Sequence, residues 1–237
     1  VRMYVGSSGY LITQDAHFFA TSKIENEGTI EVRGNWINKN TTTLSGDGKY
    51  DVKGGSGQQI SPNGATVKRI VVENANDVTL LSSGTVDNLV LTSGDLDIGD
   101  NDLTLTNEPT GGSSSSSIKI SGTGLVKATV GSTPITLPIG RNPYLPIIID
   151  DGGDNEFTVG VSDEVYSNPS TQTGVLTNDD VVSETWTIQS EAAVDNVIVT
   201  IQWELSEEEN NFDRANAHLN YWEEGSSAWD NGSKMAA

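Results

Sequence analysis

The chain has 237 residues, a net charge of −20 and no cysteine. The excess of acidic residues argues against nucleic acid and anionic membrane surfaces as partners. The lack of cysteine excludes a disulfide framework, thiol catalysis and thiolate metal sites. The hydrophobic content of 35% is low for a compact enzyme. The apolar residues nevertheless alternate in order, which argues against disorder, and no apolar run is long enough to span a membrane.

The first half of the chain, to about residue 130, is predicted to consist of short strands, because no window of it has helical periodicity. The predicted strands include Tyr10–Ile12, Thr29–Val32, Lys49–Val52, Arg69–Val72, Val78–Leu81, Thr85–Leu91, Ser117–Ile120 and Gly124–Val130. Glycines at the corners between strands are predicted to adopt positive φ: Gly28, Gly34, Gly46, Gly48, Gly84, Gly94, Gly99 and Gly122.

One stretch, LVLTSGDLDIGDNDLTLTN at residues 89–107, shows the repeating unit most clearly. It contains three apolar pairs, each with its members two residues apart and each pair seven residues after the last: Leu89 and Leu91, Leu96 and Ile98, Leu103 and Leu105. A spacing of two places both side chains of a pair on one face of a strand. The residues between the pairs have turn compositions. The unit is therefore a very short strand followed by a corner.

Three such faces would make a coil of about 21 residues, within the range of solenoid repeats. We therefore predict an all-β fold that starts with a short right-handed parallel β-solenoid (β-helix) over residues 1–128. Inward Leu, Ile and Val would form ladders along its axis, and Asp, Thr, Ser and Asn would point outward. A β-sandwich of short strands is the alternative for this half.

The pattern changes after about residue 128, where longer strands with aromatic residues follow. In VIVTIQW, the side chains of Val197, Val199, Ile201 and Trp203 share one face. Such alternation is typical of an antiparallel sheet with one buried face. Residues 129–237 are therefore predicted to form an antiparallel β-sandwich of immunoglobulin-like size. The chain begins VRMYVG and ends GSKMAA, so we interpret it as a piece of a longer protein whose sandwich is incomplete.

Carboxylates are the main candidates for a metal site. Calcium prefers six to eight hard oxygen ligands, and two acid-rich loops can supply such oxygens. The candidate calcium ligands are Asp95, Asp97, Asp100, Asp102, Asp150, Asp151 and Asp154. Neither loop has the EF-hand spacing or the nonapeptide of calcium-binding β-rolls, and solvated turns are the alternative. No cofactor is required by the sequence; Ca²⁺ is the one ion that it accommodates.

Catalytic motifs are missing: no nucleophile elbow, HExxH helix, P-loop or dinucleotide fingerprint occurs. His17 and His218 have no second ligand nearby in sequence. Polysaccharide lyases and hydrolases on β-helices need a long groove with basic residues, which are sparse here, so the chain is predicted not to be an enzyme. Among the tryptophans, Trp186 and Trp203 lie in alternating strands and are predicted to be buried.

Three motifs of the first half belong together: NEGTIEVRGNWINKN, GDGKYDVKGGSGQQISPNG and the LxLTxGxL step. With them the sequence resembles the repetitive regions of large secreted surface proteins of Bacteroidota that use type IX secretion. The residues that carry it are Asn26, Gly28, Gly34, Trp36, Gln59, Ile60, Leu89, Leu91, Gly94 and Leu96. The resemblance implies export, an extracellular or cell-surface location, and an adhesive or scaffold role. It carries no catalytic residues, and no sorting domain is visible here.

The sequence therefore predicts a non-enzymatic extracellular structural protein, either a surface adhesin or a subunit of a cell-surface appendage or filament. Its expected partners are other protein subunits, through self-assembly or neighbouring domains, and cell-surface glycans; neither nucleic acid nor membrane insertion is expected. The alternative function is a carbohydrate-binding module of a secreted polysaccharide-degrading protein.

Overall fold

A computed structural model describes residues 2–18, 23–39, 44–194, 196–223 and 227–230. The described residues are almost entirely β, with two short 3₁₀ helices, η1 (Leu205–Glu207) and η2 (Arg214–Asn216). The chain divides into two compact units, Val1–Gly160 with Thr187–Gln202 and Val161–Trp186 with Trp203–Ala237. The predicted all-β fold with a β-solenoid is confirmed, and the solenoid lies in the first unit.

The solenoid has three faces, and the third face is a parallel sheet of seven strands, one per coil. Its strands are β3 (Ala16–Phe18), β6 (Trp36–Asn38), β9 (Gln58–Ser61), β11 (Val78–Leu80), β13 (Leu96–Asp97), β16 (Ile118–Lys119) and β19 (Ile139–Gly140). The ladder Val78, Leu96, Ile118 and Ile139 is in register along this face. Adjacent partners are 18 to 22 residues apart, so the predicted coil length of about 21 residues is confirmed.

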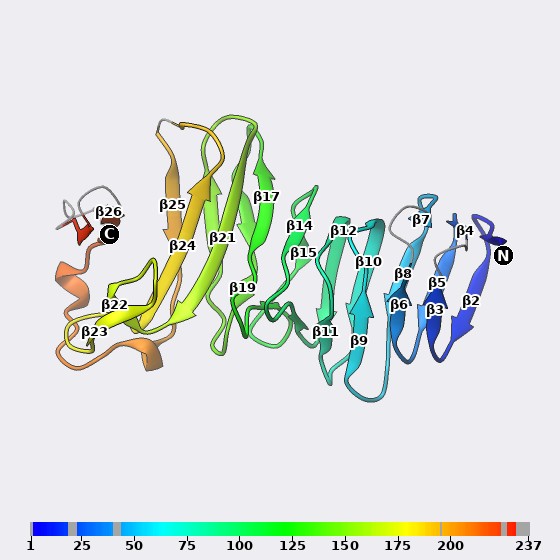
Figure 1. Ribbon diagram of the computed structural model, residues 1–237, viewed down its shortest axis with the longest axis horizontal. Helices are drawn as coiled ribbons and strands as arrows, with labels where there is room; N and C mark the ends of the chain where they lie inside the picture. The colour runs from blue at the N-terminus through cyan, green and yellow to red at the C-terminus, as the bar shows by residue number, and fades with distance from the viewer. Residues whose placement is uncertain (1, 19–22, 40–43, 195, 224–226, 231–237) are drawn as a thin grey trace. The chain divides into compact units, whose positions relative to one another are not determined.

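The first and second faces are formed by strands that precede each third-face strand (Figure 1). The first face contains β1 (Arg2–Val5), β4 (Lys23–Asn26), β7 (Leu44–Ser45), β14 (Leu103–Leu105) and β17 (Val126–Val130). The second face contains β2 (Tyr10–Thr13), β5 (Thr29–Val32), β8 (Lys49–Val52) and β15 (Thr110–Gly111). Two longer strands, β10 (Thr66–Glu73) and β12 (Gly84–Ser93), cover both faces, because β12 pairs with β14 through its first residues and with β15 through later ones.

The apolar pairs of residues 89–107 lie on three successive faces, as the seven-residue spacing predicts. Leu89 and Leu91 are on β12, Leu96 is on β13, and Leu103 is on β14. All six members of the pairs are buried. Each joins an inward ladder, such as Ile30, Tyr50, Ile70 and Leu89 on the second face. Stacking of such ladders removes apolar surface from water continuously along the axis, which stabilises the solenoid.

The corner glycines only partly behave as predicted. Gly46, Gly94 and Gly99 have positive φ, whereas the other five do not. Those five positions require glycine because a Cβ atom would have no room there. At Gly28, for example, a Cβ atom would lie 2.2 Å from the carbonyl oxygen of Gly9 in the preceding coil. The prediction of positive φ at every corner is therefore wrong, because the close approach of neighbouring coils selects glycine as effectively as a left-handed backbone does.

The direction of pairing changes after β17. This strand pairs antiparallel with β21 (Asn155–Asp163), with Val126 opposite Val159, and β24 (Glu184–Ser190) follows β21 in the same sheet. A second antiparallel sheet consists of β18 (Ile135–Leu137), β20 (Ile147–Asp150) and β25 (Ile198–Ile201). The change occurs close to the predicted boundary at residue 128, and that boundary stays a prediction.

The second unit contains small antiparallel pairs. A hairpin joins β22 (Val165–Asn168) to β23 (Thr173–Thr177), and β26 (Trp222–Glu223) pairs with β27 (Ala228–Trp229).

In the predicted strand VIVTIQW of the first unit, only residues 198–201 form β25. Val199 and Ile201 are half-buried and Ile198 and Thr200 exposed, so the alternation is confirmed but the burial is partial. In the described part of the chain β25 is an edge strand of its sheet.

Candidate functional site

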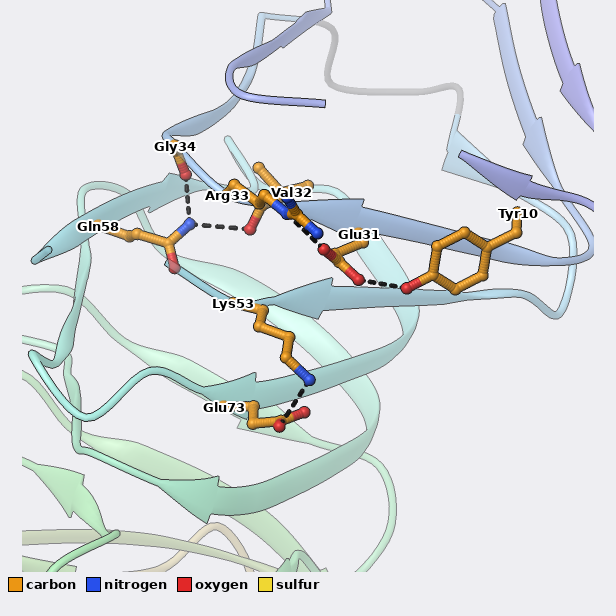
Figure 2. A network of polar contacts seen from close by, with 8 residues as sticks. All are labelled: Tyr10, Glu31, Val32, Arg33, Gly34, Lys53, Gln58 and Glu73. Atoms are coloured by element: carbon orange, nitrogen blue, oxygen red, sulfur yellow. Dashed lines mark hydrogen bonds and ion pairs between the residues drawn. The ribbon is translucent and has the colours of Figure 1, made fainter. Parts of the chain in front are cut away.

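A network of charged residues lies on the second face of the early coils, and Figure 2 shows much of it. Glu31 on β5 is bracketed by two donors: the hydroxyl of Tyr10 donates to its Oε2, and Arg33 Nε lies 2.6 Å from its Oε1. In the following coils, Lys53 Nζ lies 2.7 Å from Glu73 Oε1. The chain folds this way because coils of about 20 residues place these side chains side by side.

Glu31 and Asp51 are direct cross-strand partners on β5 and β8. Both are buried although they occupy outward positions. Two adjacent carboxylates would repel each other, so the surrounding cations matter. Lys49 Nζ lies 2.8 Å from Asp51 Oδ2, and Arg33 pairs with Glu31. Asp51 Oδ1 is buried and has no hydrogen-bond partner in the described structure. The arrangement holds the two carboxylates in place with cations on both sides.

The electrostatics of the network follow from its hydrogen bonds. The bond from Tyr10, followed by the bond from Arg33, lowers the pKa of Glu31 below its ordinary value, and the same bond raises the pKa of the Tyr10 hydroxyl. The hydrogen bond to Glu73 raises the pKa of Lys53. The charged forms of Glu31 and Lys53 and the neutral hydroxyl of Tyr10 are therefore favoured. The network keeps its charges over the ordinary pH range, as a structural ion-pair ladder does.

Replacing Tyr10 with phenylalanine will raise the pKa of Glu31, because one of its two donors is lost while Arg33 remains. A carboxyl whose pKa is lowered by folding adds stability above its unfolded value of 4.5, and that stability is lost as the pH falls through the folded pKa. NMR titration of the side-chain carboxyl carbon measures the change. Tyr4→Phe is the matched control, since Tyr4 is exposed and is not hydrogen-bonded to Glu31; an equal effect of both substitutions would contradict the assignment.

The acids of the loop predicted to bind calcium have defined partners in the next coil. Asp95 Oδ1 accepts hydrogen bonds from Ser117 N and Oγ, at 2.8 and 2.9 Å. Asp100 Oδ1 accepts from Thr123 N at 2.9 Å. The other two do the same: Asp97 Oδ1 accepts from Ser121 Oγ at 2.7 Å, and Asp102 Oδ1 accepts from Leu125 N at 3.0 Å. These carboxylates bind the backbone and hydroxyl donors of the corner that follows about one coil later.

Hydrogen bonds of the same kind, from a corner N–H to a side-chain oxygen of the preceding coil, occur in earlier coils. Asp77 Oδ1 accepts from Asp95 N at 2.9 Å, and Asp15 Oδ1 accepts from Asn35 N at 2.7 Å. Asn35 Oδ1 in turn accepts from Gln59 N at 2.9 Å. Corner N–H groups that the sheets leave unpaired are satisfied by side chains of the preceding coil, which lowers the cost of burying them. The corner acids thus connect successive coils.

The second predicted calcium loop contains Asp150, Asp151 and Asp154. Asp151 closes the turn itself: its Oδ1 accepts from Gly153 N and its Oδ2 from Asn155 Nδ2, each at 2.8 Å. Asp150 ends β20, and Asp154 is exposed. Across the parts of the chain that the structure describes, no group of three or more His, Cys, Asp and Glu side chains is gathered around a common metal position. Calcium binding by either loop stays a prediction.

Substitutions of Asp100 distinguish two roles of the corner acids, hydrogen bonding to the next coil and calcium binding. Asp100→Asn keeps an oxygen that can accept from Thr123, so the urea midpoint will stay near that of the parent, whereas Asp100→Ala will lower it. The hydrogen bond from Thr123 also lowers the pKa of Asp100, so its contribution is present above the unfolded value of 3.8 and fades as the pH falls. If calcium raises the midpoint of the parent and Asp100→Asn abolishes that increase, the carboxylate is a metal ligand.

Buried amides form a second polar set that sequence patterns did not indicate. Asn74 Nδ2 donates to Gln58 Oε1 at 2.9 Å, and Gln58 Nε2 donates to the carbonyl oxygens of Val32, at 3.0 Å, and Gly34. Figure 2 shows Gln58 directed at these carbonyls. Asn26 and Asn38 are also buried and bound to backbone carbonyls. The signal that could have found them is a polar residue at an inward position beside a glycine corner.

The tryptophans do not form a flat platform. Trp36 is buried in an aromatic stack with Phe18 and Tyr50. Trp222 and Trp229 meet edge to face, with ring planes 73° apart, and coplanar exposed rings are what sugar stacking would use. Trp186 on β24 and Trp203, which follows β25, are half-buried, so their predicted burial is only partial.

Comparison of this chain with protein-family models, with curated proteins and with solved structures finds no match. No helix within the described ranges is long and apolar enough to cross a membrane. The contacts and charges above are therefore the basis on which a function can be argued.

Proposed function

We propose that the chain is a non-enzymatic structural segment of an extracellular protein, either a surface adhesin or a subunit of a cell-surface appendage. The observation that supports this most is the use of the polar side chains. Corner acids bind the next coil, buried amides bind backbone carbonyls, and outward carboxylates pair with Lys or Arg. Side chains that could otherwise form a reactive cluster are occupied in contacts within and between coils. Such a solenoid acts by being stiff and by presenting surfaces at fixed spacing.

The sequence resemblance to repetitive regions of large secreted surface proteins supports an extracellular location. The net charge of −20 supports a role in a solvent-exposed assembly and disfavours anionic partners. Expected partners are other protein subunits and cell-surface glycans. Two structural refinements belong to the same proposal: the solenoid is right-handed, and residues 129–237 form an immunoglobulin-sized β-sandwich. The three-stranded antiparallel sheet that contains β20, and the antiparallel pairing of β17 with β21, support the second refinement.

Antibodies raised against residues 44–160 test the location and role. If the proposal is correct, they label intact cells that produce the protein, and external protease removes the label. A cytoplasmic protein probed in parallel controls for lysis. Labelling that requires lysis would contradict the proposal. Binding of the purified chain to an insoluble polysaccharide in a pull-down, lost when Trp222 and Trp229 are replaced, would instead favour the carbohydrate-binding alternative.

A further inference from the structure

The hairpin of β22 and β23 in the second unit leaves one edge and both faces of β23 exposed. The two strands form a sheet of their own (Figure 1), and β22 is the one strand that pairs with β23 in the described structure. All five residues of β23 are exposed, with Val175 at 76% and Leu176 at 44%. These two residues are adjacent, so their side chains point to opposite faces. A two-stranded hairpin is only marginally stable in water, so a third strand would stabilise it.

The backbone of β23 presents hydrogen-bonding groups at its outer edge. Val175 N is directed at β22, where it donates to Ser167 Oγ at 3.0 Å. Successive residues of a strand direct their backbone groups to opposite edges, so the N–H and C=O of Leu176 point away from β22. Tyr166 lies opposite Leu176, and its carbonyl oxygen accepts from Trp229 Nε1 at 3.0 Å. Natural sheet edges are usually protected by charge or proline, and the sequence TGVLT of β23 has neither.

The segments on either side of the hairpin have partners of their own. Before β22, Glu164 N donates to Ser183 O at 2.6 Å, and after β23, Asp180 N donates to Asn210 O at 2.7 Å. The chain therefore holds the hairpin at its base through residues that lie both before and after it. The outer edge of β23 stays exposed although its neighbours in sequence are hydrogen-bonded.

The surroundings of this edge are strongly negative. The described residues of the second unit include twelve Asp and Glu and one Arg, a net charge of −11. The arginine, Arg214, is paired with Glu208, with 2.6 Å between Nε and Oε1. At the base of the hairpin, Glu164 accepts from Tyr166 Oη at 2.6 Å and Asp179 accepts from an asparagine amide at 2.7 Å. These donors are neutral, so they leave the negative charge in place, and it attracts a cationic partner.

We propose that the outer edge of β23 binds an extended, cationic segment of a partner protein, which adds to the hairpin as a third strand. Main-chain hydrogen bonds to Leu176 fix the segment, and its alternating side chains cover Val175 on one face and Leu176 on the other. Its Lys or Arg side chains are attracted by the carboxylates at the base of the hairpin. A second copy of this chain is disfavoured as the occupant, because it would bring two acidic units together.

This inference rests on the proposed role of presenting surfaces to other protein subunits, and it adds the chemistry of one such subunit. Titration of the purified chain with a short peptide of alternating lysine and valine, followed by NMR, tests it. We expect saturable binding that weakens as salt is added and that protects the Leu176 amide from hydrogen exchange. The control is the same peptide methylated at every internal backbone nitrogen, which keeps the charge but cannot donate to β23. Equal binding of the two peptides, binding of neither, or self-association of the chain through β23 would overturn the proposal.

Two substitutions of Leu176 locate the contact. Leu176→Pro removes the outward N–H and leaves the pairing with β22, since proline is tolerated on an edge strand where the N–H faces outward. Leu176→Ala is the matched control, because it shortens the side chain and keeps the N–H. We expect the proline variant to bind the peptide about tenfold more weakly than the alanine variant, and circular dichroism verifies that both fold. Equal affinities would contradict pairing along this edge. If the proline variant does not fold, the comparison of the two peptides on the parent chain decides.

The peptide measurement and the cell-surface measurement can fail independently. Peptide binding at β23 by a protein that antibodies reach only after lysis would keep the edge site and overturn the proposed location. A protein that is labelled on intact cells, but whose Leu176 amide the peptide does not protect, would keep the location and overturn the edge site.

Discussion

Replacing Leu96 with alanine will lower the free energy of unfolding by about 2–5 kcal/mol. Leu96 is fully buried on β13 and lies in register between Val78 and Ile118 of the adjacent coils. Removing its side chain leaves a cavity that touches three successive coils. Coils of a solenoid are stabilised mainly by their nearest neighbours, and the loss weakens contacts on both sides of the substituted coil.

Leu81→Ala is the matched control for this prediction. Leu81 directly follows β11 and is 45% exposed, so its substitution will cost about 1 kcal/mol or less. Urea denaturation followed by circular dichroism gives both values. Amide hydrogen exchange shows whether the Leu96 variant loses protection of its amides first in β11, β13 and β16, as stabilisation by nearest neighbours requires. Equal destabilisation by the two substitutions would contradict the assignment of Leu96 to an inward ladder.

Replacing Gly94 with alanine will destabilise the chain by about 2–4 kcal/mol. Gly94 has φ +70°, and an added Cβ atom would lie 1.8 Å from the carbonyl oxygen of Asn74 in the preceding coil. The corner cannot move away easily, because Gly94 N donates to Ser115 O at 3.0 Å and Asn74 N donates to Ser93 O at 3.0 Å. The expected cost combines left-handed strain with a displacement of neighbouring coils.

Gly64→Ala separates these two contributions. Gly64 has a similar φ of +73°, but no atom lies within 4 Å of the position that its Cβ would occupy. Its substitution will therefore cost only the backbone strain, about 1 kcal/mol. Urea midpoints of the two variants measure the difference. If Gly64→Ala proves as damaging as Gly94→Ala, the close approach of the coils is not the reason for glycine at residue 94.

The solenoid was predictable because its signal is local. Within one coil, three apolar pairs indicate both the strand period and the corner: Leu89 and Leu91, Leu96 and Ile98, and Leu103 and Leu105. Stacking of such coils buries the pairs. The coil length followed from the same seven-residue spacing. These features need no knowledge of which coil packs on which.

The polar contacts were less predictable because their partners lie about one coil away in sequence. The partner of Asp100 is Thr123 and that of Asn35 is Gln59, and the coil length varies enough to hide such pairs. Clustered acids therefore suggested metal loops, although the carboxylates of the first loop bind donors of the next coil and Asp151 of the second loop closes its own turn. The burial of Glu31 and the role of Gln58 likewise depend on register between strands, which composition does not fix.

The central claim is that this chain is a stiff parallel solenoid. The most direct test of it is to measure distances between strands of the third face. The chain lacks cysteine, so spin labels can be placed without background by substituting cysteine at two outward positions, His17 on β3 and Lys119 on β16. These strands are five steps apart in the seven-stranded sheet, and each step adds about 4.8 Å. Pulsed electron–electron resonance should give a narrow distribution near ~24 Å, and a pair at Ile37 and Lys119 should give ~19 Å. Broad distributions, or distances that do not decrease by one strand spacing, would contradict the account.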